Sequence, residues 1–359
     1  MCKFAAVQKF LVIQTAFIGD VVLATALIEK LHAFFPDARI DFLVRKGNEA
    51  LLAGHPWLNQ VLVWDKKKGK LKNLWAMGGR IRREKYDKVI NVQRFAATGL
   101  LTAFSGAKET IGFNKNPMSQ LFNKRVPHIV GVPERADAPV NMWDLDGGGI
   151  YVEFHEVKRN QLLIEDFTDK IPGRPRLYPT AGDEEKVRPY KKGRFITVSP
   201  ASVWFTKQYP KEKWVEFLRV LPAEYTVYLL GGPGDKELCA QIVAESGRGT
   251  DLSGQLSFLQ SAALMKGAVM NYVNDSAPMH FASAVNAPVT AVYCSTIPGF
   301  GFGPLSDVKF IVEIKEPLDC RPCGLHGYKA CPRGHFNCAY KIEEAQLLQT
   351  LSLSQPNGH

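Results

Sequence analysis

The chain of 359 residues lacks any apolar run of the roughly 18 residues that a membrane-spanning helix needs. Its N-terminus, where Lys3 and Lys9 flank a short apolar stretch, lacks the apolar core and cleavage site of a signal peptide. We therefore expect a cytoplasmic protein. With 46% hydrophobic and 22% charged residues, the composition is that of a globular protein long enough to form two domains.

Motifs for nucleic-acid and dinucleotide binding are also missing. The sequence contains no helix-turn-helix signature, zinc finger or aromatic-basic RNA-binding motif, so nucleic acid is not an expected partner despite a pI of 9.2. The turn at residues 15–20 lacks the three glycines of a dinucleotide fingerprint, which argues against a nicotinamide cofactor.

Strand-like apolar runs alternate with helical patterns along the chain, which predicts an α/β protein with parallel sheets and helices on both faces. A stretch rich in Pro and Arg at 171–179, followed by the charged residues 183–192, predicts an interdomain linker. We expect Rossmann-like domains at 1–175 and 194–341, a linker at 176–193, and a C-terminal helix and tail at 342–359 that is a candidate to pack back on the first domain. The expected strands are 10–14, 39–44, 60–64, 88–92, 195–199, 226–230, 269–273 and 289–293.

A polar turn at residues 274–280 follows one expected strand and opens a helix. Asp275 or Ser276 can cap this helix and Pro278 fits its first turn, which leaves backbone N–H groups and the positive end of the helix dipole free to bind a phosphate. His280 lies about one turn further, on the same side as Ser276. The alternative is a well-capped structural helix with a half-buried histidine.

A second informative turn follows the first expected strand. Gly19 allows close backbone approach, and Asp20 lies where the carboxyl end of a strand opens into a crevice, the usual ligand position in open α/β sheets. The alternative role of Asp20 is that of N-cap for the helix predicted over 21–35.

These motifs resemble those of glycosyltransferase family nine, the ADP-heptose:lipopolysaccharide heptosyltransferases (heptosyltransferase II-like), and the resemblance covers nearly the whole chain. One departure is Ala277, because the family usually has glycine there. The resemblance implies the GT-B architecture, in which two Rossmann-like domains with parallel sheets face each other across a cleft. The matching motifs are Gly19-Asp20, Ser199-Pro200-Ala201-Ser202 with Lys207, Gly231-Gly232-Pro233-Gly234-Asp235 with Glu237, and Asn274-Asp275-Ser276 with His280.

The resemblance also implies an activity: inverting transfer of a heptose from ADP-heptose to the lipopolysaccharide inner core. Asp20, on the acceptor-binding N-terminal domain, is the implied general base, and Lys207 would neutralise the leaving diphosphate. No metal is required for transfer, because a lysine and a helix N-terminus can replace it. The residues implied in binding the donor and the reacting groups are Gly19, Ser202, Asp235, Glu237, Asn274, Asp275, Ser276, Ala277 and His280, with Asp235 or Glu237 on the ribose.

Two other functions stay open. One is a GT-B transferase for another nucleotide sugar or a sugar-nucleotide epimerase, which would need a second acid or base near the sugar. The other is a non-catalytic protein that binds anionic glycolipid. The presence of Asp20, Lys207 and His280 together argues against it, because binding alone requires no base.

The net charge of +10 is concentrated in one segment, since residues 64–88 carry ten Lys or Arg against three Asp or Glu. Leu71, Leu74, Trp75 and Ile81 fall on one face of an otherwise basic predicted helix, a pattern suited to an anionic lipid surface or an acidic acceptor. The alternative is a solvated basic face. With a lipopolysaccharide acceptor, we expect peripheral contact with the cytoplasmic face of the inner membrane.

Four of the seven cysteines cluster near the end of the chain, at Cys320, Cys323, Cys331 and Cys338. A structural zinc site is one interpretation, because thiolates in a reducing compartment are free to bind metal. Reduced thiols without metal are the second. A disulfide is the least favoured, because the expected compartment is reducing.

Overall fold

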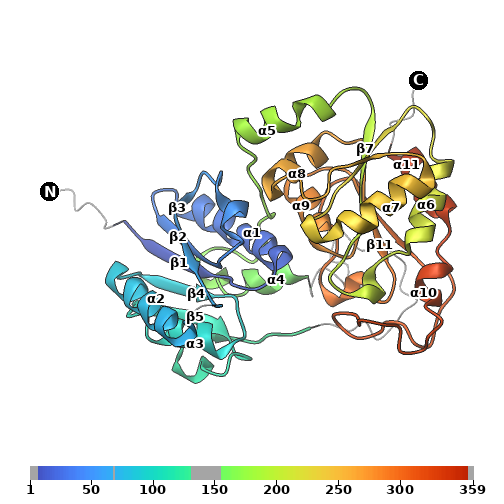
Figure 1. The fold of residues 1–359 in the computed structure, drawn as a ribbon. Coiled ribbons are helices and arrows are strands. Elements are labelled where there is room, and N and C mark those ends of the chain that lie inside the picture. Colours follow the sequence, from blue (N-terminus) through green and yellow to red (C-terminus); the bar gives the residue numbers. More distant parts are fainter. Residues whose placement is uncertain (1–6, 68, 131–154, 355–359) are drawn as a thin grey trace. The chain divides into compact units, whose positions relative to one another are not determined.

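The computed structural model describes residues 7–67, 69–130 and 155–354, and these divide into two compact units with a boundary between Tyr178 and Pro179. Each unit contains one six-stranded sheet in which all neighbouring strands are parallel (Figure 1). This confirms the predicted α/β class with two parallel sheets.

The sheet of the first unit has the strand order β3-β2-β1-β4-β5-β6. The chain runs outward from β1 in one direction and then returns to β4 on its other side, so β1 and β4 form the topological switch point. The elements are β1 (Lys9–Ile13), α1 (Ile18–Phe34), β2 (Arg39–Arg45), η1 (Glu49–Leu52), β3 (Leu58–Trp64), α2 (Lys70–Glu84), β4 (Lys88–Asn91), α3 (Ala96–Ala103), β5 (Glu109–Phe113), η2 (Ser119–Leu121), β6 (Lys124–Val126), α4 (Glu156–Gln161) and η3 (Glu165–Phe167).

The second unit repeats this plan with the strand order β12-β11-β10-β7-β8-β9, and its switch point lies between β7 and β10. All residues of β7, β10 and β11 are buried, as expected for strands covered by helices on both faces. The elements are α5 (Ala181–Val187), η4 (Arg188–Tyr190), β7 (Phe195–Ser199), η5 (Phe205–Lys207), α6 (Lys211–Val220), β8 (Thr226–Leu229), η6 (Pro233–Asp235), α7 (Lys236–Ser246), β9 (Thr250–Asp251), α8 (Phe258–Lys266), β10 (Met270–Asn274), α9 (Ala277–Ala284), β11 (Val289–Tyr293), η7 (Pro298–Phe300), β12 (Lys309–Glu313), α10 (Asn337–Tyr340) and α11 (Glu344–Leu353).

The segment expected as a linker is partly helical. Its charged part forms α5, which begins with a capping box between Thr180 and Asp183 and packs on α8 within the second unit. The charged residues that predicted a linker therefore lie mostly on the solvent-facing side of the surface helix α5.

The C-terminal helix α11 packs within the second unit. Leu347 and Leu351 of α11 belong to the core of this unit, where the helix packs on α6 and β12. The hydroxyl of Tyr272 on β10 donates a hydrogen bond to the Leu347 carbonyl at 3.1 Å. The apolar face of α11 therefore completes the core of its own unit.

Helix α2 forms where the basic segment predicted a helix, but the expected apolar face is divided. Met77 and Ile81 are buried in the core of the first unit, whereas Leu71 and Trp75 are exposed. Among the described residues, no helix is both long and apolar enough to cross a bilayer.

Candidate active site

The candidate site of the second unit lies at the carboxyl ends of β7 and β10, where the strand order reverses. The chain leaves β7 at Ser199 and β10 at Asn274, and these adjacent parallel strands bring the following loops together. In open α/β sheets this crevice is the position at which ligands bind.

Lys207 and Asp275 meet at this edge. The ammonium Nζ of Lys207, at the end of η5, lies 2.6 Å from Asp275 Oδ2, and the two side chains are only 15% and 7% exposed. The hydroxyl of Thr296, which follows β11, donates a hydrogen bond to the same carboxylate oxygen at 2.7 Å. Three loops are thus joined at one buried carboxylate, and a lysine is held where a diphosphate was expected.

Asn274 holds the same loops together through its side-chain amide. Its Nδ2 donates to the Pro200 carbonyl at 2.7 Å, and its Oδ1 accepts a hydrogen bond from the Tyr209 backbone N–H at 3.0 Å. The side chain is fully buried. Both ends of the amide are engaged with backbone, so Asn274 positions the loop that carries Lys207.

Helix α9 begins at Ala277, with Ser276 in extended backbone at the N-cap position and Pro278 in the first turn. The Ser276 hydroxyl donates to the Asn274 carbonyl at 3.4 Å, and no side chain caps the helix. Ser276, one of the two expected caps, therefore occupies the N-cap position, but its side chain makes no capping hydrogen bond, and the Asp275 carboxylate is bound to Lys207 and Thr296 instead. The N-terminus of α9, which is the positive end of the helix dipole, therefore lies at the switch point and has no side-chain cap.

His280 lies in the second turn of α9 and is 5% exposed, rather than half-buried. Burial lowers the pKa of its imidazole to about 4, opposed by the negative charge of Asp275 and reinforced by Lys207. Among the described residues, nothing hydrogen-bonds to its Nδ1 atom. His280 is therefore a neutral imidazole within electrostatic reach of the Lys207–Asp275 pair.

The turn after β8, beside β7, contains the two carboxylates expected near a ribose. Asp235 Oδ2 accepts a hydrogen bond from the Gly232 backbone N–H at 2.7 Å and so stabilises its own turn. Glu237, in the first turn of α7, is exposed and contacts only the Gln241 amide among the described residues, at 3.4 Å. Ser202 lies in the loop after β7, with its carbonyl accepting from Gln208 at 2.6 Å. Of the two carboxylates, Glu237 is the more available to a ligand.

Asp20 lies at the switch point of the first unit, as the third residue of α1. The N-cap is Phe17, so the alternative role of Asp20 as N-cap is wrong, and Gly19 is an ordinary residue of the first helical turn. Burial, together with the nearby negative charge of Glu156, raises the pKa of Asp20 to about 7. Backbone N–H groups and Arg94 act in the opposite direction. A carboxyl group with this pKa can accept a proton near neutral pH.

Helix α4 carries the negative charge that acts on Asp20. Glu156 and Arg159 form a buried ion pair in this helix, with 2.5 Å between Oε2 and an Arg159 terminal nitrogen. His155 caps the same helix by accepting a hydrogen bond from the Val157 N–H. In the sequence this pair is a Glu and an Arg three residues apart, a spacing that is common on solvated helices, and the fold reveals that the pair is buried.

The loops after β1 and β4 are joined by a polar network. The side chain of Gln93 donates to that of Gln14, and Lys66 donates to the carbonyl and hydroxyl of Thr15 at 3.0 and 2.7 Å. Phe17 and Phe95, the residues before α1 and α3, are both largely exposed. This edge thus combines a carboxyl group that titrates near neutrality with cations and apolar surface.

The cysteine cluster does not form a metal site among the described residues, since no group of three or more Cys, His, Asp or Glu is placed to hold an ion. Cys320, Cys323, Cys331 and Cys338 are all free thiols in the structure. Cys320 Sγ lies 3.8 Å from His335 Nε2. Burial raises the pKa of Cys338 to about 11, which keeps it protonated. The structure thus gives no support to zinc.

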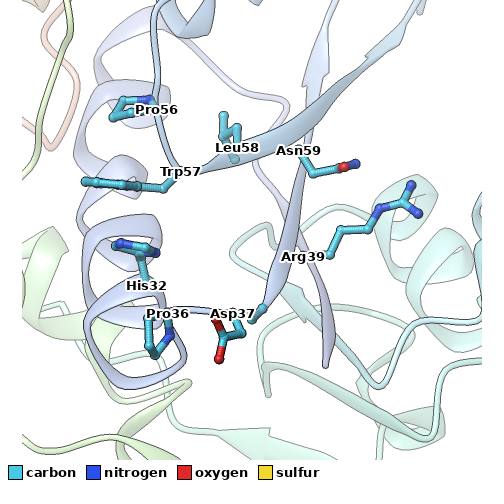
Figure 2. A pocket seen from close by; sticks show the side chains of 9 residues that line it. His32, Pro36, Asp37, Arg39, Pro56, Trp57, Leu58 and Asn59 are labelled. Atoms are coloured by element: carbon cyan, nitrogen blue, oxygen red, sulfur yellow. The ribbon is translucent and has the colours of Figure 1, made fainter. Parts of the chain in front are cut away.

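A shallow pocket of about 460 Å³ opens at the opposite edge of the first sheet, where β2 and β3 begin (Figure 2). The rings of His32 and Trp57 stack there with 3.8 Å between their centroids, and Asp37 and Arg39 lie beside them. None of the site residues expected from the sequence lines this pocket.

Comparison with known proteins identifies the family. Residues 74–325 match the model of glycosyltransferase family 9 (heptosyltransferase). The chain belongs to this family. It is therefore a glycosyltransferase, and the GT-B fold class implied by the sequence motifs is confirmed.

Relatives of this family 9 glycosyltransferase include lipopolysaccharide heptosyltransferase 3 of Escherichia coli, which is 25% identical over 294 residues that cover 78% of this chain and 82% of the relative. The solved structure of E. coli ADP-heptose lipopolysaccharide heptosyltransferase II has a TM-score of 0.73 at 21% identity, covering 97% of this chain and 98% of that one. E. coli heptosyltransferase WaaC, solved with ADP, has a TM-score of 0.71 at 16% identity, covering 97% and 100%.

Proposed function

We propose that this glycosyltransferase transfers a heptose from ADP-heptose to the inner core of lipopolysaccharide, with inversion at the anomeric carbon. The observation that carries the proposal is the Lys207–Asp275 pair at the switch point of the second unit, directly before the N-terminus of α9. A family relative of the same fold was solved with ADP, which supports ADP as the nucleotide.

The proposed donor site uses the second unit alone. The Lys207 ammonium and the α9 N-terminus stabilise the charge that develops on the ADP leaving group, with Ser202, Ser276 and the N–H groups from Asp275 to Ala277 around the phosphates. Neutral His280 lies beside this charge, and Glu237 accepts hydrogen bonds from the ribose. Because these groups supply the positive charge, we expect transfer to proceed in the presence of EDTA.

The proposed general base is Asp20. As the acceptor hydroxyl attacks the anomeric carbon, its proton passes to the Asp20 carboxylate while the bond to the ADP oxygen breaks. A single base and one direct displacement invert the anomeric centre. The raised pKa of Asp20, about 7, suits this step, because the carboxylate is ionised above neutral pH and still basic enough to take a proton.

We further propose that the enzyme works in the cytoplasm, in peripheral contact with the inner membrane, because its proposed acceptor is a lipid. The basic segment around α2 supports this part of the proposal, since residues 64–88 carry ten Lys or Arg against three Asp or Glu.

The test is acceptor-dependent release of ADP from ADP-heptose with a heptose-deficient lipopolysaccharide. We expect Asp20→Ala to lose transfer but still bind ADP, and Lys207→Ala to lose both transfer and much of the ADP affinity. Asp37→Asn, an exposed carboxylate at the opposite edge of the first sheet, is the matched control and should stay active. ADP binding without turnover on any core acceptor would contradict the proposed acceptor.

The same assay separates the alternatives. An epimerase would convert the nucleotide sugar without acceptor and without release of ADP. A transferase for another sugar would release nucleotide only with a different donor. A non-catalytic glycolipid-binding protein would bind the acceptor but give no turnover with any donor.

A further inference from the structure

Helix α2 presents two large apolar side chains to solvent. Leu71 is 72% exposed and Trp75 is 76% exposed. They lie four residues apart, one turn along the same stripe of the helix, while Met77 and Ile81 on another stripe fill the core of the first unit. The fold therefore does not require Leu71 or Trp75, and a neighbouring pair of this kind marks an interaction surface.

The same helix and its C-cap residue carry basic side chains that form no ion pair with a described carboxylate. Among the described residues, no carboxylate forms an ion pair with Lys70, Lys72, Arg82, Arg83 or Lys85. The one acidic residue of the helix, Glu84, is bound to Arg39 at 3.1 Å. The positive charge of this surface is therefore uncompensated, and its preferred partner is anionic.

The neighbouring helix α3 brings a further exposed apolar side chain close to Arg82 of α2. Helices α2 and α3 lie side by side on one face of the first sheet (Figure 1). Arg82 lies over the turn that follows α3, since a Cβ added at Gly106 would be 3.3 Å from Arg82 Cγ. This turn begins at Phe104, which is 56% exposed.

We propose that α2 docks this enzyme on the surface of an anionic lipid bilayer. Leu71 and Trp75 enter the boundary between headgroups and acyl chains, and Lys72, Arg82 and Arg83 contact lipid phosphates. Nucleic acid would use the cations but would leave Leu71 without a role. The proposal deepens the membrane contact proposed above and rests on it. Vesicle binding is measured without donor or acceptor, so its failure is distinguishable from failure of sugar transfer.

The experiment is co-sedimentation of the full-length protein with vesicles of phosphatidylcholine alone or mixed with phosphatidylglycerol. We expect binding only to the mixed vesicles, weakened by salt. Leu71→Ser/Trp75→Ser and Lys72→Glu/Arg83→Glu should each lower the partition coefficient by on the order of tenfold or more. All four positions are exposed, and thermal unfolding checks that the variants fold.

The matched controls change exposed residues elsewhere, Ile171→Ser for the apolar pair and Lys186→Glu/Lys192→Glu for the charges, and should bind as wild type does. Lipids brominated near the headgroup should quench the fluorescence of wild type more than that of Trp75→Phe. Equal losses in controls and α2 variants would overturn the proposal. So would an oligonucleotide that binds through Lys72 and Arg83 when anionic vesicles do not bind.

Discussion

The Lys207 ammonium lies 2.6 Å from the Asp275 carboxylate. This ion pair is almost fully buried and joins the loops after β7 and β10. In the proposed reaction this pair has two consequences. Asp275 fixes the lysine at the switch point before any ligand arrives, and an incoming diphosphate meets a cation that is already desolvated. The arrangement thus predicts that loss of Lys207 affects stability as well as activity.

Replacing Lys207 with Met should lower the free energy of unfolding by about 3 kcal/mol, because it leaves the Asp275 charge buried with only the Thr296 hydrogen bond. Lys207→Met/Asp275→Asn should recover much of this loss, since neither charge remains. Urea denaturation measures both. Lys211→Met, which breaks a more exposed ion pair with Glu245, is the control and should cost about 1 kcal/mol or less. Equal losses at Lys207 and Lys211 would contradict the prediction.

The raised pKa of Asp20 predicts opposite effects of pH on activity and stability. Ionised Asp20 is the base, so kcat/KM should rise about tenfold from pH 6 to pH 8, with a midpoint near 7. The folded-state pKa lies above the usual aspartate value of 3.8, so the folded form binds the proton more tightly, and stability falls as pH rises from about 4 to 7.

Asp20→Asn should therefore abolish transfer and yet be more stable than wild type at pH 8, by on the order of 3 kcal/mol. At pH 4, where wild-type Asp20 is protonated in the folded state, the difference should largely vanish. Denaturation at the two pH values is the measurement. An inactive variant that is less stable at pH 8 would indicate a structural role for the carboxylate.

Eight of the twelve described strands could be predicted from the sequence, because apolar runs such as 195–199 and 289–293 alternate with amphipathic helices. The strands β5, β6, β9 and β12 and the order of the strands in each sheet were not predicted. The local chemistry of Lys207 and Asp275 was also visible as motifs, but their ion pair was not, since 68 positions separate them. An apolar helical face does not by itself reveal what covers it. The apolar face of α11 fills the core of the second unit, and the predicted face of α2 is divided, because Ile81 packs in the core whereas Leu71 and Trp75 are exposed.

Glu156 is predicted to act on the reaction through Asp20. Its negative charge contributes to the raised pKa of Asp20, so Glu156→Gln should move the midpoint of the pH–kcat/KM profile to lower pH. The variant should also be less stable, because Arg159 keeps its buried charge without a carboxylate partner. A purely structural role would lower activity equally at all pH values and leave the midpoint in place. Glu165→Gln, another carboxylate of the first unit, is the control.

The lowered pKa of His280 predicts that the protein loses stability in acid. Burial lowers its pKa in the folded protein to about 4, whereas the unfolded chain takes up the proton near the usual histidine value of 6.5. Stability should therefore be lost as pH falls from about 6.5 to 4, by about 3 kcal/mol over the full window.

His280→Gln introduces a side chain that stays neutral, so it should remove the part of the pH dependence that comes from His280. Urea denaturation at pH 4.5 and pH 7 measures this. His128 in the first unit has its pKa lowered to about 4 by burial as well, so His128→Gln should remove a separate share and the double variant both. If His280→Gln loses as much stability in acid as wild type does, then His280 is charged in the folded protein. A cationic imidazole beside Lys207 would then be a second positive group facing the diphosphate.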